Sequence, residues 1–140
     1  MLSEPATGYI RRLQSESVHE VSVMSSIVEA VLQELEKHDI EKVEAVDMVV
    51  GELTFLGEDQ LQFAYEIITR DTILEGSKLN IIPEKIEIKC KSCGYIGPVN
   101  YIHQGDHYSH PDLTCPKCGS GVEILKGKSA AVRSLQVVEN

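Results

Sequence analysis

Four cysteines stand in two Cys-x-x-Cys pairs, and this spacing is typical of a metal site. The pairs are Cys90 with Cys93 and Cys115 with Cys118, separated by residues 94–114, and the chain has no further cysteine. Each pair can form a tight turn that directs two thiolates at one point. Two such turns facing each other make a tetrahedral cage of four sulfurs, the closed environment that structural zinc prefers. The cysteines therefore predict a structural zinc site.

A four-thiolate zinc site has a consequence for function. Because sulfur fills all four positions, no water remains on the metal to be activated, so the zinc would fold a module rather than catalyse a reaction. Disulfides are disfavoured because nothing in the sequence indicates secretion, and a thioredoxin-type dithiol needs only one pair. A four-sulfur iron site remains an alternative.

The size and charge of the chain limit the function classes. Its 140 residues can form one modest core plus a small metal-dependent module, and the net charge of −9 argues against a general nucleic-acid binder. An acidic protein suits cations or basic partner surfaces. The sequence shows neither an apolar run near the ~20 residues that span a bilayer nor an apolar secretory signal. We therefore expect a cytoplasmic protein that does not bind membranes.

The chain is expected to begin with an irregular stretch. Residues 1–17 are polar and aperiodic, which predicts a disordered or weakly ordered leader, either an expression remnant or a start codon set too far upstream. Residues 19–23 could form a short strand. An amphipathic helix is expected next, capped by Ser22 or Ser26 and ending near His38. Apolar residues recur in it three and four positions apart: Met24, Ile27, Val28, Val31, Leu32 and Leu35.

Further along the chain, strands are predicted at residues 42–50, 78–82 and 131–138, with a second helix from about Glu58 to Thr69. Pro83 is expected to interrupt the strand before it. The pattern indicates an α/β (α+β) fold with a small mixed sheet, two helices on one face and an inserted zinc-ribbon domain. The predicted boundaries are a leader at 1–17, an α/β domain at 18–88 and 123–140, and the zinc ribbon at 89–122.

An ordered set of short motifs extends the argument. Beside the two Cys-x-x-Cys-Gly turns stand His19-Glu20-x-Ser22, Gly51-Glu52-Leu53, Leu61-x-Phe63-Ala64 and Glu75-Gly76-x-x-Leu79-x-Ile81. In this order, over residues 18–139, the chain resembles the hydrogenase/urease nickel-insertion accessory family (HypA/HybF). The cysteine pairs alone are weak support for the resemblance, whereas the ordered combination is specific.

The resemblance implies a nickel carrier. The family delivers Ni²⁺ to the precursor of the [NiFe] hydrogenase large subunit, and in some organisms to urease, and works with the GTPase of the pathway. It binds nickel through a Met-His-Glu start, which makes His19 the principal ligand, supported by nearby backbone nitrogens and by Glu20. Cys90, Cys93, Cys115 and Cys118 would hold the structural zinc. Such a protein binds and transfers its cargo and is not an enzyme; a monomer or a homodimer is expected.

The chemistry is reasonable for residues of these types. Ni²⁺ accepts imidazole and favours square-planar or octahedral nitrogen and oxygen ligands. Imidazole also competes with protons near its pKa of ~6.5, so acid should release the metal. The sequence departs from the family in one place, because Val18 stands where the family has Met. Valine is what a GUG start codon encodes internally, which suggests a natural start at residue 18. Without that start, residue 18 has no free amine for nickel.

Other residues and one other function stay open. His103, His107 and His110 lie between the cysteine pairs and could form a second metal site, although loop histidines are usually just exposed. Glu52 could face the nickel site or be a solvated acid at a strand end. The alternative function is a zinc-ribbon nucleic-acid-binding or protein-adaptor module, which for nucleic acid would require a salt-dependent affinity.

Overall fold

The chain folds into two units. The computed structural model describes residues 4–103, 105 and 109–140, with side chains from residue 19 onward. One unit, called here the helical unit, comprises the residues up to Met48 together with Leu56–Ile82 and Ala131–Asn140. The other, the cysteine unit, comprises Val49–Phe55 and Pro83–Ala130.

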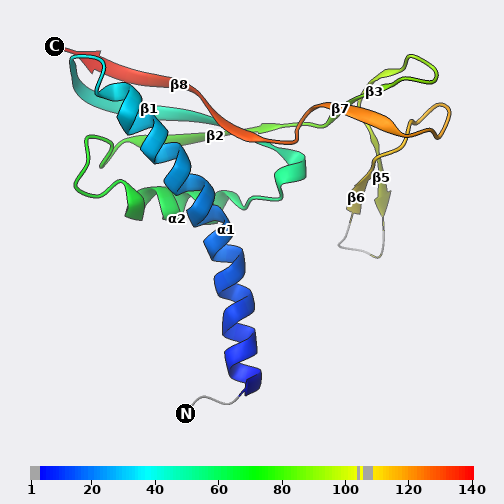
Figure 1. Ribbon diagram of the computed structural model, residues 1–140, viewed down its shortest axis with the longest axis horizontal. Coiled ribbons are helices and arrows are strands. Elements are labelled where there is room, and N and C mark those ends of the chain that lie inside the picture. Colours follow the sequence, from blue (N-terminus) through cyan, green and yellow to red (C-terminus); the bar gives the residue numbers. More distant parts are fainter. Residues whose placement is uncertain (1–3, 104, 106–108) are drawn as a thin grey trace. The chain divides into compact units, whose positions relative to one another are not determined.

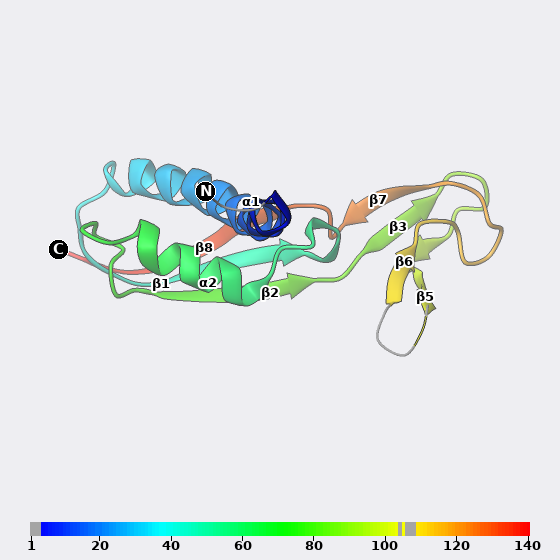
Figure 2. The same ribbon diagram turned by 90° about the horizontal axis from the view of Figure 1, so that it is seen from below.

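The helical unit is a three-stranded sheet with two helices on one face. It is built from α1 (Glu4–Leu35), β1 (Ile40–Gly51), α2 (Glu58–Ile68), β2 (Lys78–Glu84) and β8 (Ala130–Glu139), with strand order β2-β1-β8. Strands β1 and β2 run in the same direction and β8 runs in the opposite direction (Figure 1). Both helices lie on the same side of the sheet (Figure 2). The predicted mixed sheet with two helices on one face is confirmed.

The core of this unit lies between the helices and the sheet. Apolar residues at spacings of three and four line the inner faces of α1 and α2, and alternate residues of β1 meet them. The helices also pack against each other. The buried apolar residues of this core include Met24, Val28, Val31 and Leu35 of α1, Leu61, Ala64 and Tyr65 of α2, and Val46 and Met48 of β1.

The amino-terminal prediction differs from the structure. Residues 19–23 lie inside α1, so the predicted strand is wrong. The predicted cap at Ser22 or Ser26 is wrong as well, because both serines lie within the helix. The backbone of residues 4–17 also belongs to α1, where the sequence predicted a weakly ordered leader. Among the residues whose side chains are described, the first buried position of the helix is Glu20, four residues before Met24. An acid at a position where the pattern calls for an apolar residue concealed this part of the helix.

The predictions for the later elements of the helical unit are close to the structure. Strand β1 and helix α2 match within two residues. Strand β2 does not end before Pro83 but continues to Glu84. Proline is tolerated there because β2 is an edge strand, on which outward positions need no N–H donor. The side chain of Gln62 donates a 2.7 Å hydrogen bond to the Leu79 carbonyl and so ties α2 to this edge strand.

The cysteine unit consists of short antiparallel strands around a small core. One sheet has the order β4-β3-β7, and a separate hairpin pairs β5 with β6. The core comprises Ile86, Ile88 and Val99, with Leu53 and Ile124 among the residues packed against them. The elements are η1 (Glu52–Thr54), β3 (Glu87–Cys90), β4 (Ile96–Gly97), β5 (Asn100–His103), β6 (Ser109–Asp112) and β7 (Val122–Lys126).

This unit is wider than the predicted zinc ribbon at residues 89–122, since it also takes in residues 49–55, 83–88 and 123–130. The reason is a close backbone approach. The Gly51 amide donates to the Ser129 carbonyl and the Leu53 amide donates to the Gly127 carbonyl, at 2.9 and 2.8 Å. A Cβ atom on Gly51 would lie 2.3 Å from the Gly127 oxygen, so only glycine fits this crossing.

No helix in the described part of the chain combines the length and the apolar character needed to cross a membrane.

Candidate functional site

The four cysteine sulfurs converge on one point. The Sγ atoms of Cys90, Cys93, Cys115 and Cys118 all lie within 4.8 Å of one another. The Cys90–Cys118 and Cys93–Cys115 sulfur pairs are each 3.5 Å apart. A tetrahedral zinc ion with Zn–S bonds of ~2.3 Å holds its sulfurs about 3.8 Å apart, so the cage fits zinc. Within the described part of the chain, these four residues are the only group of three or more His, Cys, Asp or Glu with metal-binding geometry.

Both cysteine turns have the same backbone geometry. The Gly94 amide donates to the Cys90 carbonyl and the Gly119 amide donates to the Cys115 carbonyl, each at 2.9 Å. The two glycines have φ angles of 82° and 78°, in the left-handed region that residues with a Cβ avoid. The glycine after each pair, visible in the sequence, therefore closes the turn that directs the two sulfurs inward.

Hydrogen bonds at the second turn favour thiolates. Bonds from the Ser120 side chain and backbone, together with the Cys90 thiol, lower the pKa of Cys118 to about 6. The Lys117 amide also points at the Cys115 sulfur, at 3.4 Å. Because the thiolate is the form that binds metal, the cage carries a ligand ready for zinc at neutral pH.

The two predicted nickel ligands, His19 and Glu20, have opposite environments. His19 is exposed on α1, whereas Glu20 is only 6% exposed. Successive side chains on a helix diverge by about 100°, which separates the two. Oε1 of Glu20 accepts a 3.3 Å hydrogen bond from the Gly57 amide at the start of α2. The structure thus presents His19 to solvent and directs the Glu20 carboxylate into the protein.

The backbone amides of residues 18–20 are also constrained. These residues lie in the interior of α1, which begins at Glu4. In an α-helix each interior N–H donates to the carbonyl four residues earlier, and only the first four N–H groups are free. A chelate that uses the backbone nitrogens near His19 therefore requires this turn of the helix to open.

Glu52 lies in the cysteine unit and makes defined contacts. It accepts a 2.5 Å hydrogen bond from the Tyr101 hydroxyl, and its other oxygen lies 3.7 Å from Lys85 Nζ. The Lys85 ammonium is 5.9 Å from the centre of the Tyr101 ring. This three-residue cluster was not predicted, because its members are far apart in the sequence and only the folded hairpin brings Tyr101 to Glu52.

The histidines between the cysteine pairs do not converge where the structure describes them. His103 of β5 is paired with Ser109, and His110 of β6 is paired with Ile102. Adjacent pairs of an antiparallel ladder project to opposite faces, so His103 and His110 point to opposite sides of the hairpin. His107 lies outside the described residues. The described histidines therefore do not form the second metal site considered from the sequence.

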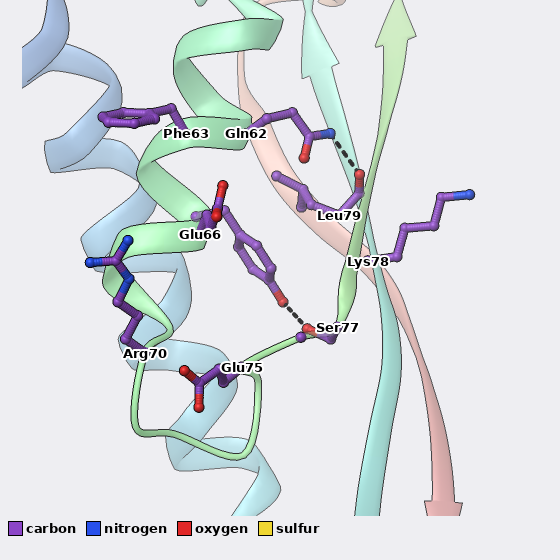
Figure 3. A pocket seen from close by; sticks show the side chains of 10 residues that line it. Gln62, Phe63, Glu66, Arg70, Glu75, Ser77, Lys78 and Leu79 are labelled. Carbon is purple, nitrogen blue, oxygen red and sulfur yellow. Dashed lines mark hydrogen bonds between the residues drawn. The ribbon is translucent and has the colours of Figure 1, made fainter.

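The helical unit also has an open hollow of about 640 Å³ between α2 and the start of β2 (Figure 3). Its wall is braced by a 2.6 Å hydrogen bond between the Tyr65 hydroxyl and Ser77 Oγ. Phe63, Glu66 and Arg70 of α2 line it as well. None of the predicted metal ligands lines this hollow, so it is separate from both candidate metal sites.

The fold and the four-thiolate cage define the class: a two-unit α+β protein with a zinc-ribbon-like metal site and no open coordination position on that metal. Residues 18–137 match the family model described as hydrogenase/urease nickel incorporation, metallochaperone, hypA. The chain belongs to this family.

Curated relatives and solved structures agree with this assignment. The chain is 34% identical over 126 residues to the hydrogenase maturation factor HypA of Methanocaldococcus jannaschii, covering 86% of this chain and 97% of that protein. It is 33% identical over 121 residues to the factor of Methanothermobacter thermautotrophicus, with the same coverage. A solution structure of a HypA protein matches with a TM-score of 0.64 and 27% identity, over 86% of this chain and 97% of that one. The nickel metallochaperone HypA from Helicobacter pylori, at 24% identity, has the same fold, with a TM-score of 0.61 over 86% of this chain and 98% of its own.

Proposed function

We propose that this protein is a nickel metallochaperone that binds Ni(II) at the segment around His19 and delivers it during the maturation of [NiFe] hydrogenase. The observation that carries the proposal is the match of residues 18–137 to the nickel-incorporation family, together with an exposed His19 at the start of that match. The four cysteines hold zinc as a structural ion. Nickel is the cargo, and the protein acts by binding and transfer, without catalysis.

The position of His19 suits a carrier. An exposed imidazole can reach both a metal in solution and a recipient protein, and imidazole is a ligand that Ni(II) accepts. Neighbouring backbone nitrogens complete the ligand set once the surrounding helical turn opens, and Glu20 supports the site. A site made from one short segment can be opened by a partner, which allows release of the cargo. Protons compete for the imidazole, so binding weakens as the pH falls below about 6.5.

The proposal includes partners and a cellular place. The acidic chain, with a net charge of −9, suits basic partner surfaces. We assign it to the cytoplasm, where it meets the GTPase of the hydrogenase maturation pathway and the hydrogenase large-subunit precursor. The family description names both hydrogenase and urease. Hydrogenase is the proposed recipient because the relatives of M. jannaschii and M. thermautotrophicus are named hydrogenase maturation factors.

The test is a calorimetric titration of the zinc-loaded chain with Ni²⁺ at neutral pH. We expect about one nickel per chain for the wild type and no measurable binding for His19→Ala. The matched control is His103→Ala, which removes another exposed histidine, in the cysteine unit, and should bind nickel like the wild type. Nickel binding that survives His19→Ala, or that is lost in His103→Ala, would place the site elsewhere and contradict the proposal.

A further inference from the structure

Glu20 is buried, although a carboxylate that served as a nickel ligand would have to be accessible. Its side chain is 6% exposed, and Oε1 accepts the 3.3 Å hydrogen bond from the Gly57 amide. The other oxygen, Oε2, is inaccessible to solvent and has no hydrogen-bond partner among the described residues. A buried carboxylate with an unsatisfied oxygen is destabilising, so the fold keeps Glu20 in this place at a cost in free energy.

The start of α2 explains why an acceptor is needed there. Gly57 is the N-cap residue of α2, and as a glycine it has no side chain with which to cap the helix. In an ordinary capping box, the residue at the third helical position reaches back to the N-cap amide. Here Glu20 of α1 accepts from that amide instead. Its negative charge also lies at the positive end of the α2 dipole, which favours it.

The same geometry argues against Glu20 as a metal donor. A nickel ion bound by the exposed His19 would need a carboxylate that reaches the surface. One oxygen of Glu20 is engaged by Gly57, and the other is enclosed by protein. To coordinate the ion, the side chain would have to leave its site and break the bond to α2.

We propose that Glu20 is a positioning residue for nickel binding: its carboxylate ties α1 to the N-terminus of α2 and thereby fixes the adjacent His19, without contributing a donor atom to the metal. This inference rests on the proposed nickel function. The side-chain bond to Gly57 holds residue 20 in place even when the backbone hydrogen bonds of the turn before it open for the nickel, so His19 stays next to a fixed point when the ion binds. Such preorganisation strengthens binding because less freedom is lost when the complex forms.

The test uses the full zinc-loaded chain and compares Glu20→Ala, Glu20→Gln and Glu29→Gln. The amide oxygen of glutamine accepts the same hydrogen bond but is a poor nickel donor, and Glu29 is an exposed acid on the same helix. Two quantities are measured: hydrogen exchange of the Gly57 amide without nickel, and Ni²⁺ affinity by calorimetry. We expect Glu20→Ala to speed Gly57 exchange and to weaken nickel binding, each by roughly tenfold. Glu20→Gln should stay within about threefold of the wild type in both, and Glu29→Gln should change neither.

Each contrary result has a distinct meaning. If Glu20→Gln weakens nickel binding as much as Glu20→Ala while Gly57 exchange stays slow, the carboxylate is a metal donor and the positioning role is overturned. If Glu20→Ala leaves Gly57 exchange unchanged, the link to α2 does not exist. Faster Gly57 exchange with unchanged nickel affinity reduces Glu20 to a purely structural role, which also overturns the proposal. If the wild type binds no nickel, the proposed function fails, and the nickel-free Gly57 measurement shows separately whether the link exists.

Discussion

Tyr101 and Glu52 show how a single contact changes the chemistry of a side chain. Partial desolvation raises the pKa of Tyr101 to about 12 although 36% of the residue is exposed, and the hydrogen bond to Glu52 and its negative charge add to the effect. The bond joins the β5 strand between the cysteine pairs to η1 at the end of β1. Glu52 therefore belongs to the structure of the cysteine unit, and its motif is explained without a role at the nickel site.

Replacing Glu52 should lower the pKa of Tyr101. In Glu52→Gln the negative charge disappears while the partial desolvation of Tyr101 remains, so we expect the pKa to fall from about 12 part of the way to its usual value. The measurement is a ¹³C NMR titration of labelled tyrosine. Tyr65 is the internal control, because its pKa is also raised by burial but its hydroxyl bonds to Ser77. A Tyr101 pKa that does not move, or a Tyr65 pKa that moves equally, would contradict this assignment.

The same shift makes the stability depend on pH. The folded-state pKa of Tyr101 lies above the unfolded value of ~10. The contribution of its protonated hydroxyl to the free energy of unfolding is therefore fully present below pH ~10 and is lost as the pH rises towards 12. We expect the free energy of unfolding to fall less steeply over this interval in Tyr101→Phe than in the wild type. Urea unfolding of both proteins at several pH values measures the difference.

At the level of single elements, α2 has two faces with different tasks. Leu61 is fully buried against the sheet, whereas Phe63, two residues on, is 65% exposed and lines the open hollow. Alternating three- and four-residue spacing was enough to predict the inner face. The exposed ring of Phe63 adds little to the core.

This difference predicts unequal effects on stability. Leu61→Ala should lower the free energy of unfolding by about 2–5 kcal/mol, because it removes buried methyl groups and leaves a cavity. Phe63→Ala is the matched control in the same helix and should change it by less than about 1 kcal/mol, since the ring is largely in water. Urea unfolding followed by circular dichroism measures both. Equal losses in the two variants would show that the described packing of α2 is incorrect.

The position of His19 inside helix α1 predicts that the start of the chain affects the affinity for Ni²⁺. A chain that begins at residue 18, with Val18→Met, places a free amine and the unbonded amides of the first helical turn next to His19. In the 140-residue chain these amides lie inside the helix. We expect the shorter chain to bind Ni²⁺ more tightly, by roughly tenfold or more, because no helical bonds must break first. Calorimetry on both zinc-loaded chains checks this, with His19→Ala in each as the control; equal affinities would show that the backbone nitrogens do not contribute.

For the whole molecule, the two units depend on different sources of stability. The helical unit has a continuous apolar core between two helices and a sheet. The cysteine unit has a core of three buried apolar residues and four sulfurs directed at one point. A module with so small a core needs a metal to fold, because the apolar area it buries does not offset its conformational entropy.

Removing zinc should therefore unfold one unit and leave the other. Upon chelation, or in Cys93→Ser, we expect loss of amide dispersion in NMR spectra for residues of β3 to β7, while α1 and α2 keep their helical signals. Ser92→Ala is the control, since it changes a residue inside the same Cys-x-x-Cys turn without removing a ligand. Cooperative loss of both units, or an intact cysteine unit without zinc, would contradict this division.

Local spacing allowed much of the molecule to be predicted. The two cysteine turns with their glycines, β1 and α2 could be recognised from the sequence, because each depends on residues close together in the chain. The cage and the family could be recognised as well, because their short motifs recur in a specific order along the chain. The amphipathic stripe of α1 was found only from Met24 onward, since Glu20 interrupts it. The extent of the cysteine unit was underestimated because residues 49–55 join it through backbone contacts with residues 127–129.

Only the tertiary structure gives His19 and Glu20 their different environments. The two residues are adjacent in sequence, but His19 faces water whereas Glu20 contacts Gly57, 37 positions away. In the same way, Glu52 acquires its partner from a hairpin 49 positions on, and strand register sends His103 and His110 to opposite faces. Residue type and spacing specify which ligands a segment can offer. Burial and register, which depend on long-range packing, decide which of those ligands a metal can reach.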